Sequence, residues 1–145
     1  MVWEVDNKVN MKLKMTEKIA YNLISSYVQG WKEDNIALIT QPLSSDCLII
    51  ESHGPTYKGI RTIRKWVKVW IASGNKVTKW DINSFYFTGR AAIFEWVFKC
   101  IVKSKFYHID GITIVVFKNN RIKYLHEYRM TKPAYKWGEL EIVGD

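Results

Sequence analysis

The sequence has few cysteines and no long apolar run. Of its 145 residues only two are Cys, and Cys47 and Cys100 each lie in an apolar, strand-like stretch where a thiol behaves as a small hydrophobe. This usage fits a reducing compartment. No segment approaches the roughly 20 apolar residues that cross a bilayer, and the first residues lack a hydrophobic secretion segment. We therefore expect a cytoplasmic protein with no membrane partner.

Metal-binding and nucleotide-binding motifs are also missing from the sequence. No two of the three histidines are four residues apart, and no Cys, His and carboxylate spacing resembles a zinc or iron site. There is no nucleotide-binding glycine loop, no nucleophile elbow and no kinase-like set of motifs. We expect neither a metal nor a cofactor.

Positive charge predominates, and the formal net charge is +8. Clustered Lys and Arg attract polyanions, but the chain has no zinc-finger spacing, no RNA-binding signature and no basic tail, so we expect no nucleic-acid partner. Between Lys58 and Trp80 there are seven Lys or Arg and no acid. This basic stretch is either a helix face in contact with water or a docking surface for an anionic ligand or an acidic partner.

Hydrophobic periodicity predicts helices in the first half of the chain and strands in the second. Apolar residues recur at helical spacing over 17–31, after Thr16 as a cap, and again over 60–71, while Asn35 is placed to cap a short helix between them. A buried strand is expected over 47–52. From residue 77 the period is two, which predicts antiparallel strands over 77–88, 91–103, 108–117 and 121–130.

This order of elements indicates an α+β layout in a single domain. We expect the domain over 16–132, with a flexible N-terminal arm over 1–15 and a C-terminal extension over 133–145. Seven Trp and eight Tyr are more than a small core needs, so some of these rings should line a cavity or an interface.

An ordered set of weak features resembles the SnoaL-like branch of the nuclear transport factor 2-like superfamily over about residues 17 to 130. The features are Tyr27 and Trp31, Asn35 where the family usually has Asp, Asp46, Tyr57-Lys58-Gly59, and Asn120-Arg121-Ile122. The resemblance implies a cystatin-like cone, in which a bent antiparallel sheet is wrapped on three N-terminal helices and encloses a pocket. This fold serves enzymes, ligand carriers and interaction modules alike.

The ketosteroid isomerases and polyketide cyclases of this superfamily suggest catalytic residues. Alignment on Asn35 and Asp46 puts Glu51 where the isomerases have a general base and Tyr27 where they have an oxyanion-hole tyrosine. Their second oxyanion-hole donor, a protonated Asp, corresponds to Thr113. Desolvation raises the pKa of a carboxylate toward useful basicity, and a phenol can donate a hydrogen bond to an oxyanion. The alternatives are an ion pair for Glu51 and a packing role for Tyr27.

Further residues are expected to contact the substrate from the walls of the cone. Alternation in the last strand, with the resemblance, turns Glu127 and Arg129 inward, where they pair with each other, bind a substrate carboxylate or form a rim salt bridge. His53 either shuttles protons or faces solvent. The full set of expected substrate contacts is Trp31, His53, Phe94, Trp96, Thr113, Glu127 and Arg129.

Two classes of function follow from these patterns. One is an isomerase-, cyclase- or dehydratase-type enzyme that moves a proton next to the carbonyl of an apolar small molecule. The other is a non-catalytic ligand-binding or protein-interaction module, with its pocket open or filled by aromatic side chains. The half-apolar outer face of the strand over 91–103, with Ile93, Val97 and Ile101, also predicts a homodimer through the sheet.

Overall fold

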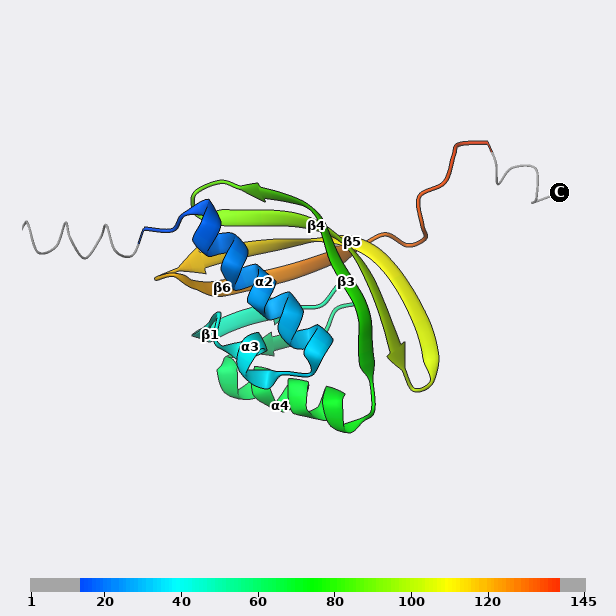
Figure 1. Ribbon diagram of the computed structural model, residues 1–145, viewed down its shortest axis with the longest axis horizontal. Coiled ribbons are helices and arrows are strands. Elements are labelled where there is room, and N and C mark those ends of the chain that lie inside the picture. Colours follow the sequence, from blue (N-terminus) through cyan, green and yellow to red (C-terminus); the bar gives the residue numbers. More distant parts are fainter. Residues whose placement is uncertain (1–13, 139–145) are drawn as a thin grey trace, which may run out of the picture.

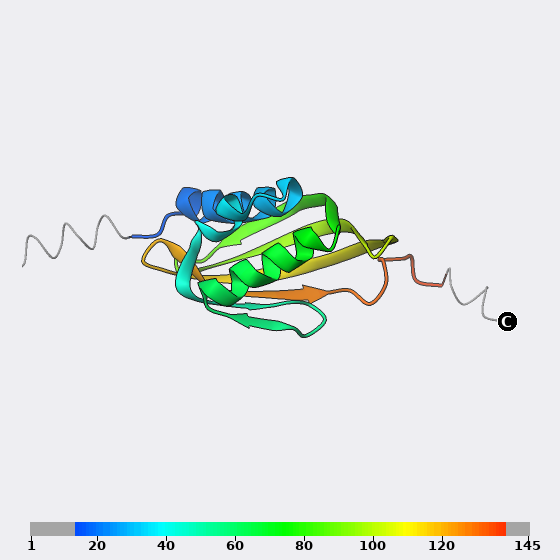
Figure 2. The same ribbon diagram turned by 90° about the horizontal axis from the view of Figure 1, so that it is seen from below.

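Three helices lie on one face of a bent six-stranded sheet in the computed structural model, which describes residues 14–138 (Figures 1 and 2). The helices are α2 (Glu17–Glu33), α3 (Ile36–Thr40) and α4 (Ile60–Ala72). The strands are β1 (Leu43–Ile50), β2 (Thr56–Lys58), β3 (Lys76–Phe87), β4 (Ala91–Val102), β5 (Lys105–Lys118) and β6 (Arg121–Arg129). The predicted α+β class and the order of the predicted elements are confirmed.

Local sequence signals explain where the first two helices begin. The Thr16 hydroxyl accepts a hydrogen bond from the Ile19 amide at 3.2 Å, and the Asn35 side chain accepts one from the Leu38 amide at 3.1 Å. Each bond satisfies an amide that the first turn of a helix leaves without a partner. α2 runs two residues beyond the predicted 17–31 and ends at Asp34, which adopts a left-handed conformation with φ of 54°.

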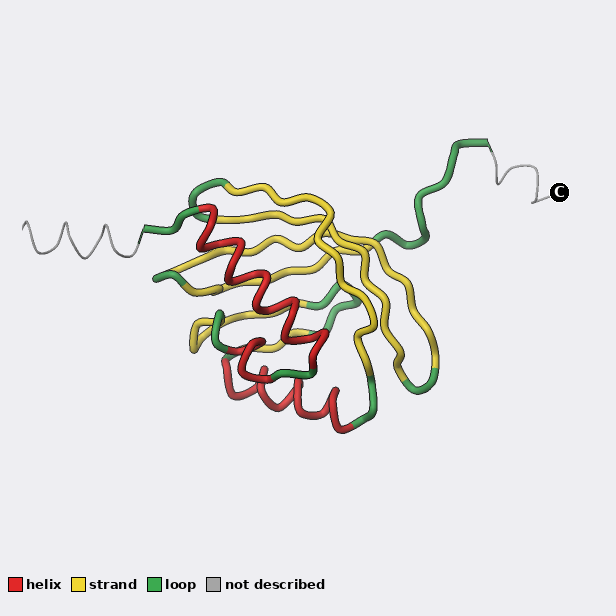
Figure 3. Tube along the Cα trace, in the orientation of Figure 1, coloured by secondary structure: helices red, strands yellow, loops and turns green. Residues whose placement is uncertain are grey.

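The sheet has the strand order β2-β1-β6-β5-β4-β3 (Figure 3). β3, β4, β5 and β6 form the predicted antiparallel meander. Two features were not predicted: the short strand β2, which pairs antiparallel with β1, and the parallel pairing of β1 with β6. In that parallel pair Ile50 lies beside His126. The chain therefore leaves β1 at Glu51, next to Glu127.

The concave face of the sheet and the helices enclose the core. Phe94 of β4, Val115 of β5 and Leu125 of β6 are at most 1% exposed, as expected for positions on the inner face of a pleated sheet. On the outer face of β4, Ile93, Val97 and Ile101 are only partly buried. The homodimer expected through this strip stays a prediction.

The ends of the chain add little to the described fold. The expected N-terminal arm falls outside the described residues up to position 13, and the expected extension does so from position 139. Between 133 and 138 there is neither helix nor strand. No helix of residues 14–138 combines the length and the apolar character needed to cross a membrane.

A buried hydrogen bond joins the inner faces of β4 and β5. The indole Nε1–H of Trp96 donates to Oγ1 of Thr113 at 2.7 Å, and Thr113 is fully buried. If a buried indole N–H loses its acceptor, the protein is destabilised by the full desolvation penalty of that N–H. The Thr113 hydroxyl is thus a structural acceptor for Trp96.

Replacing Thr113 by Val should lower the free energy of unfolding by about 1–3 kcal/mol, because the methyl group keeps the shape but leaves the Trp96 N–H without a partner. Urea unfolding measures the change. Thr78→Val is the matched control, since Thr78 lies exposed in β3 and its replacement should stay within about 0.5 kcal/mol. Equal effects of the two substitutions would contradict a structural role for the hydrogen bond.

Candidate active site

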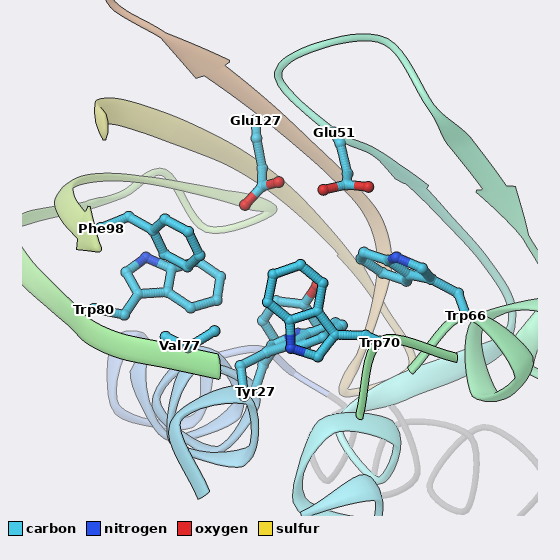
Figure 4. Close-up of a pocket in the computed structure, with 9 residues that line it drawn as sticks. Tyr27, Glu51, Trp66, Trp70, Val77, Trp80, Phe98 and Glu127 are labelled. Atoms are coloured by element: carbon cyan, nitrogen blue, oxygen red, sulfur yellow. The ribbon is translucent and has the colours of Figure 1, made fainter. Parts of the chain in front are cut away.

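Two adjoining cavities lie between the helices and the open end of the sheet. The inner cavity has a volume of about 40 Å³ and the outer cavity about 440 Å³. Both are lined by Glu51, Trp70, Phe98 and Glu127. The inner cavity is otherwise lined by Tyr27, Trp31, Trp66, Val77 and Trp80 (Figure 4). The pocket is therefore open at its mouth but narrow at its base.

Two carboxylates, Glu51 and Glu127, stand side by side where the cavities meet; we call them the acid pair. Figure 4 shows both pointing toward the aromatic rings. The Tyr57 hydroxyl donates a hydrogen bond to Oε1 of Glu51 at 2.6 Å. The Tyr57 ring stacks on Trp66 with centroids 3.9 Å apart, so this donor is held in place from α4. Glu127 makes no hydrogen bond within the described chain.

Among residues 14–138, no basic side chain forms an ion pair with either member of the acid pair. The ion pairs among residues 14–138 join Lys76 to Asp34, Lys79 to Asp81 and His108 to Asp110. Glu51 therefore lacks the ion pair that the sequence allowed for it, and Glu127 does not pair with Arg129. Like charges on neighbouring strands repel each other. One member of the pair must then hold a proton or meet a cation.

Burial identifies Glu127 as the member that holds the proton. Desolvation, and then the negative charge of Glu51, raise the pKa of Glu127 to about 8. Part of the side chain still touches the open cavity, but the surrounding protein removes most of the water that would stabilise a carboxylate. Glu127 is thus largely protonated at neutral pH. A carboxyl group in a pocket whose pKa is raised by burial is typical of acid–base sites.

Two tyrosines near the acid pair are held in the protonated form. Burial, followed by the charge of Glu127, raises the pKa of Tyr27 well above its usual value. Burial and the hydrogen bond to Glu51 raise the pKa of Tyr57. The Trp31 indole lies close to the Tyr27 hydroxyl and lowers its pKa slightly, but its N–H is outside hydrogen-bond geometry. Tyr27 is therefore a donor directed into the inner cavity.

The walls of the inner cavity are aromatic and nearly perpendicular to one another. The Trp31 and Trp70 rings meet at 89°, Tyr27 and Trp80 at 71°, and Trp80 and Phe98 at 87°. The indole nitrogens of Trp31, Trp70 and Trp80 are inaccessible to solvent and have no hydrogen-bond partner among the described residues. Since the nitrogens do not reach the open space, the rings present carbon to the cavity.

The structure brings together most of the residues that the sequence selected. Tyr27 and Trp31 line the inner cavity, and Glu51 and Glu127 line both. The outer cavity receives His53, Trp96 and Arg129. Two of the selected residues do not line either cavity: Phe94 is enclosed in the core, and Thr113 is buried against Trp96.

Sequence reasoning missed four residues of the site, namely Tyr57, Trp66, Trp70 and Trp80, whereas alternation along the strand over 91–103 placed Phe98 on the face that lines core and pocket. Trp66 and Trp70 carried a signal, because residues four apart share one face of a helix. The other two are placed by the bend and pairing of the sheet.

Metal and thiolate chemistry find little support in the described part of the chain. No group of three or more His, Cys, Asp or Glu there could hold a metal ion. Cys100 lines the outer cavity, but burial raises the pKa of its thiol to about 11. The thiol is protonated at neutral pH and is therefore a poor nucleophile.

Replacing Glu51 by Gln should lower the pKa of Glu127 below 8, because the neighbouring charge is removed, yet leave it above 4.5, because burial remains. The new amide side chain still offers a carbonyl oxygen to the Tyr57 hydroxyl, so the geometry is kept. A ¹³C NMR titration of the Glu side-chain carboxyl groups measures the shift. In the control Glu95→Gln, which alters an exposed acid, the pKa of Glu127 should not change. An unchanged value in Glu51→Gln would show that the two acids are not coupled.

Replacing Glu127 by Gln should stabilise the fold at high pH. From pH 4.5 to about 8 the folded wild type retains a proton that the unfolded chain has lost, so its stability falls as the pH rises through this window. Gln does not titrate. Urea unfolding at about pH 9 should find the variant more stable by roughly 1–2 kcal/mol, allowing for partial contact with solvent, and at about pH 4 the advantage should vanish. An advantage that does not depend on pH would refute the raised pKa.

Comparison with known proteins identifies the fold. No protein-family model matches the chain, and no curated sequence does. Solved structures do match. A putative isomerase from Bacillus subtilis superposes with a TM-score of 0.69 at 14% identity, over 80% of this chain and 90% of that one. A putative SnoaL-like polyketide cyclase from Shewanella denitrificans gives a TM-score of 0.61 at 15% identity, over 76% and 89%.

A third structure is a hypothetical protein with a ketosteroid isomerase-like fold from Catenulispora acidiphila, in complex with trimethylamine. Its TM-score is 0.63 at 17% identity, over 73% of this chain and 83% of that one. At these identities the similarity concerns the fold. The chain has the cystatin-like α+β fold of the ketosteroid isomerase-like, SnoaL-like and NTF2-like proteins, as the sequence predicted.

Proposed function

We propose that the cone binds a small molecule and that the acid pair exchanges a proton with it. The observation that carries this proposal is the presence of two adjacent carboxylates at an open cavity without a basic partner, one of them largely protonated at neutral pH. Glu51 acts as the base, and Glu127 holds a proton that it can donate. Proton transfer next to a carbonyl requires a base and an acid within reach of the same ligand.

Tyr27 completes this arrangement. Its side chain is 2% exposed, and it lines the inner cavity below the acid pair. Because the hydroxyl stays protonated, it can donate a hydrogen bond to an oxygen that becomes negative during the reaction. The apolar walls exclude water, which strengthens this interaction.

Proteins with the same fold support binding of a small molecule. The Bacillus subtilis and Shewanella denitrificans proteins are described as an isomerase and a cyclase, and the Catenulispora acidiphila protein holds trimethylamine. These descriptions belong to those proteins. They agree with a cone that admits a small molecule here, and trimethylamine is an amine that is cationic at neutral pH.

The second candidate is a ligand-binding module without catalysis. The state of Thr113 favours it, since this hydroxyl is engaged by Trp96 and cannot reach an oxyanion in the pocket. Among the described residues that line the inner cavity, Tyr27 is then the one neutral hydroxyl donor. An assay must therefore separate proton transfer from binding.

The test is deuterium exchange at the carbon next to a carbonyl, followed by ¹H NMR in D₂O. The probes are cyclohexanone, cyclohex-2-enone and aminoacetone, a ketone that carries an ammonium group. The wild type should accelerate exchange over buffer for at least one probe, and Glu51→Gln should reduce the protein-catalysed rate by roughly 10²–10⁴-fold, the usual contribution of a positioned base.

Glu95→Gln is the matched control, because Glu95 is exposed and hydrogen-bonded to Ser84 at 2.6 Å on β3. The Glu95→Gln protein should catalyse deuterium exchange into the probe at the wild-type rate. If the wild type accelerates no exchange while the probes still shift the NMR signals of pocket residues, catalysis is refuted and the ligand-binding module is supported.

A further inference from the structure

The charge of the inner cavity is opposite to that of the whole protein. The chain has a formal net charge of +8, yet none of the nine residues that line this cavity is Lys or Arg, and two of them, Glu51 and Glu127, are acids. Burying uncompensated carboxylates is costly, and a partner cation removes the cost. No described side chain supplies the positive charge that would compensate the acid pair in this cavity.

The walls indicate what kind of cation fits. Calcium takes six to eight oxygen ligands, and magnesium requires an octahedral set, whereas this cavity offers two carboxylates and a phenol among indole rings. An alkylated ammonium group is weakly hydrated and needs no ligand shell. It is attracted to the faces of Trp, Tyr and Phe within about 6 Å of the ring centre. Perpendicular rings beside an acid form such an environment.

We propose that the inner cavity binds the head group of an organic cation, a methylated or otherwise alkylated ammonium, among Tyr27, Trp31, Trp70 and Trp80 and against the acid pair. This inference rests on the proposed function in one respect, that the cone admits a small molecule. It adds the chemical class of that molecule.

The dimensions of the pocket suit a cationic head and a larger body. A cavity of about 40 Å³ holds the equivalent of roughly three water molecules, close to the four non-hydrogen atoms of a trimethylammonium group. The outer cavity of about 440 Å³ has room for the rest of the ligand. Arg129 lines only the outer cavity, so it contacts the body of the ligand and does not compete for the head-group position.

The nearly buried Tyr27 hydroxyl is a second observation that indicates a ligand. Tyr27 lines the inner cavity, and its hydroxyl makes no hydrogen bond within residues 14–138. A hydroxyl that faces open space inside a pocket is available as a hydrogen-bond donor to a ligand. A ligand atom in the cavity would satisfy it.

The cation must compete with a proton. At neutral pH Glu127 is largely protonated, so a bound cation displaces this proton, and the affinity should rise with pH up to and beyond about 8. The other titratable or charged groups that face Glu127 come from α2, the β1–β2 connection, β2, β4, β5 and β6. They are Tyr27, Glu51, His53, Tyr57, Cys100, Tyr107 and Arg129.

The experiment compares choline with 3,3-dimethylbutan-1-ol, a neutral molecule of the same shape. Titrations of the full chain are followed by ¹H–¹⁵N NMR, in which the indole N–H signals report the pocket directly. At about pH 9 choline should bind at least about tenfold more tightly than the neutral analogue, since cation–π contact and one charge pair together exceed one factor of ten. The affinity for choline should fall severalfold at about pH 6.5.

Matched variants connect the effect with the cavity. Trp70→Leu alters a half-buried cavity ring and should weaken choline binding about fivefold or more, whereas Trp137→Leu alters a ring that is 85% exposed and should not. Glu127→Gln should remove the pH dependence, and Glu95→Gln should retain it. Both Glu variants keep the shape of the side chain, so a loss of folding is not expected to obscure the result.

Each outcome bears on a different proposal. Equal affinity for choline and the neutral analogue would overturn the cation proposal and leave small-molecule binding intact. If neither molecule binds at about 50 mM, weaker than the millimolar range of a minimal ligand, the cation proposal is also overturned. The deuterium-exchange assay, which includes the neutral ketones, then decides the proposed function independently.

Discussion

The parallel pairing of β1 with β6 is the constraint on which the site depends. It places Ile50 beside His126, so that the next residue along each strand, Glu51 and Glu127, falls on the same inner face. Two carboxylates are thereby held next to each other at the open end of the cone. Because like charges in this arrangement repel, the pairing costs stability unless a proton or a cation occupies the space between them.

The neighbouring elements all act on this acid pair. β2 pairs with β1 and brings Tyr57 to Glu51, while α4 fixes the Tyr57 ring by stacking it on Trp66. Glu51 thus accepts a short hydrogen bond from Tyr57, whereas Glu127 accepts none from the described residues. The rings of α2, α4, β3 and β4 remove water from both. This difference in hydrogen bonding and solvation makes the two carboxylates chemically distinct.

Local patterns in the sequence predicted the elements but not their meeting point. Capping at Thr16 and Asn35, helical spacing and the two-residue period located the helices and the meander. Glu51 and Glu127 were each selected as candidates on separate grounds. Their adjacency depends on strands that are distant in sequence, and no short-range pattern reports a parallel register. For the same reason the sequence did not reveal β2 or the contact between Tyr57 and Glu51.

Alternation was also too coarse to separate core rings from cavity rings. It placed Phe94 and Phe98 on the same inner face of β4, where the first is fully enclosed and the second lines both cavities. Which of the two reaches open space depends on where the bent sheet leaves the helices, a property of the assembled fold. Likewise, the hydroxyl of Thr113 was expected in the pocket, but the indole of Trp96 lies within reach and engages it.

The proton on Glu127 connects the two proposals. In the empty pocket it relieves the repulsion between the acids, and a cationic head group relieves the same repulsion when it displaces that proton. An ammonium group also acidifies the C–H bonds next to it, so a carbonyl compound that carries one arrives with a proton that a carboxylate can remove. With a neutral ligand Glu127 keeps its proton and can donate it, whereas a cationic head group releases that proton to solvent and leaves Glu51 to remove and return the proton of the ligand. The pocket that attracts the cation is therefore also the pocket best prepared to deprotonate its neighbouring carbon.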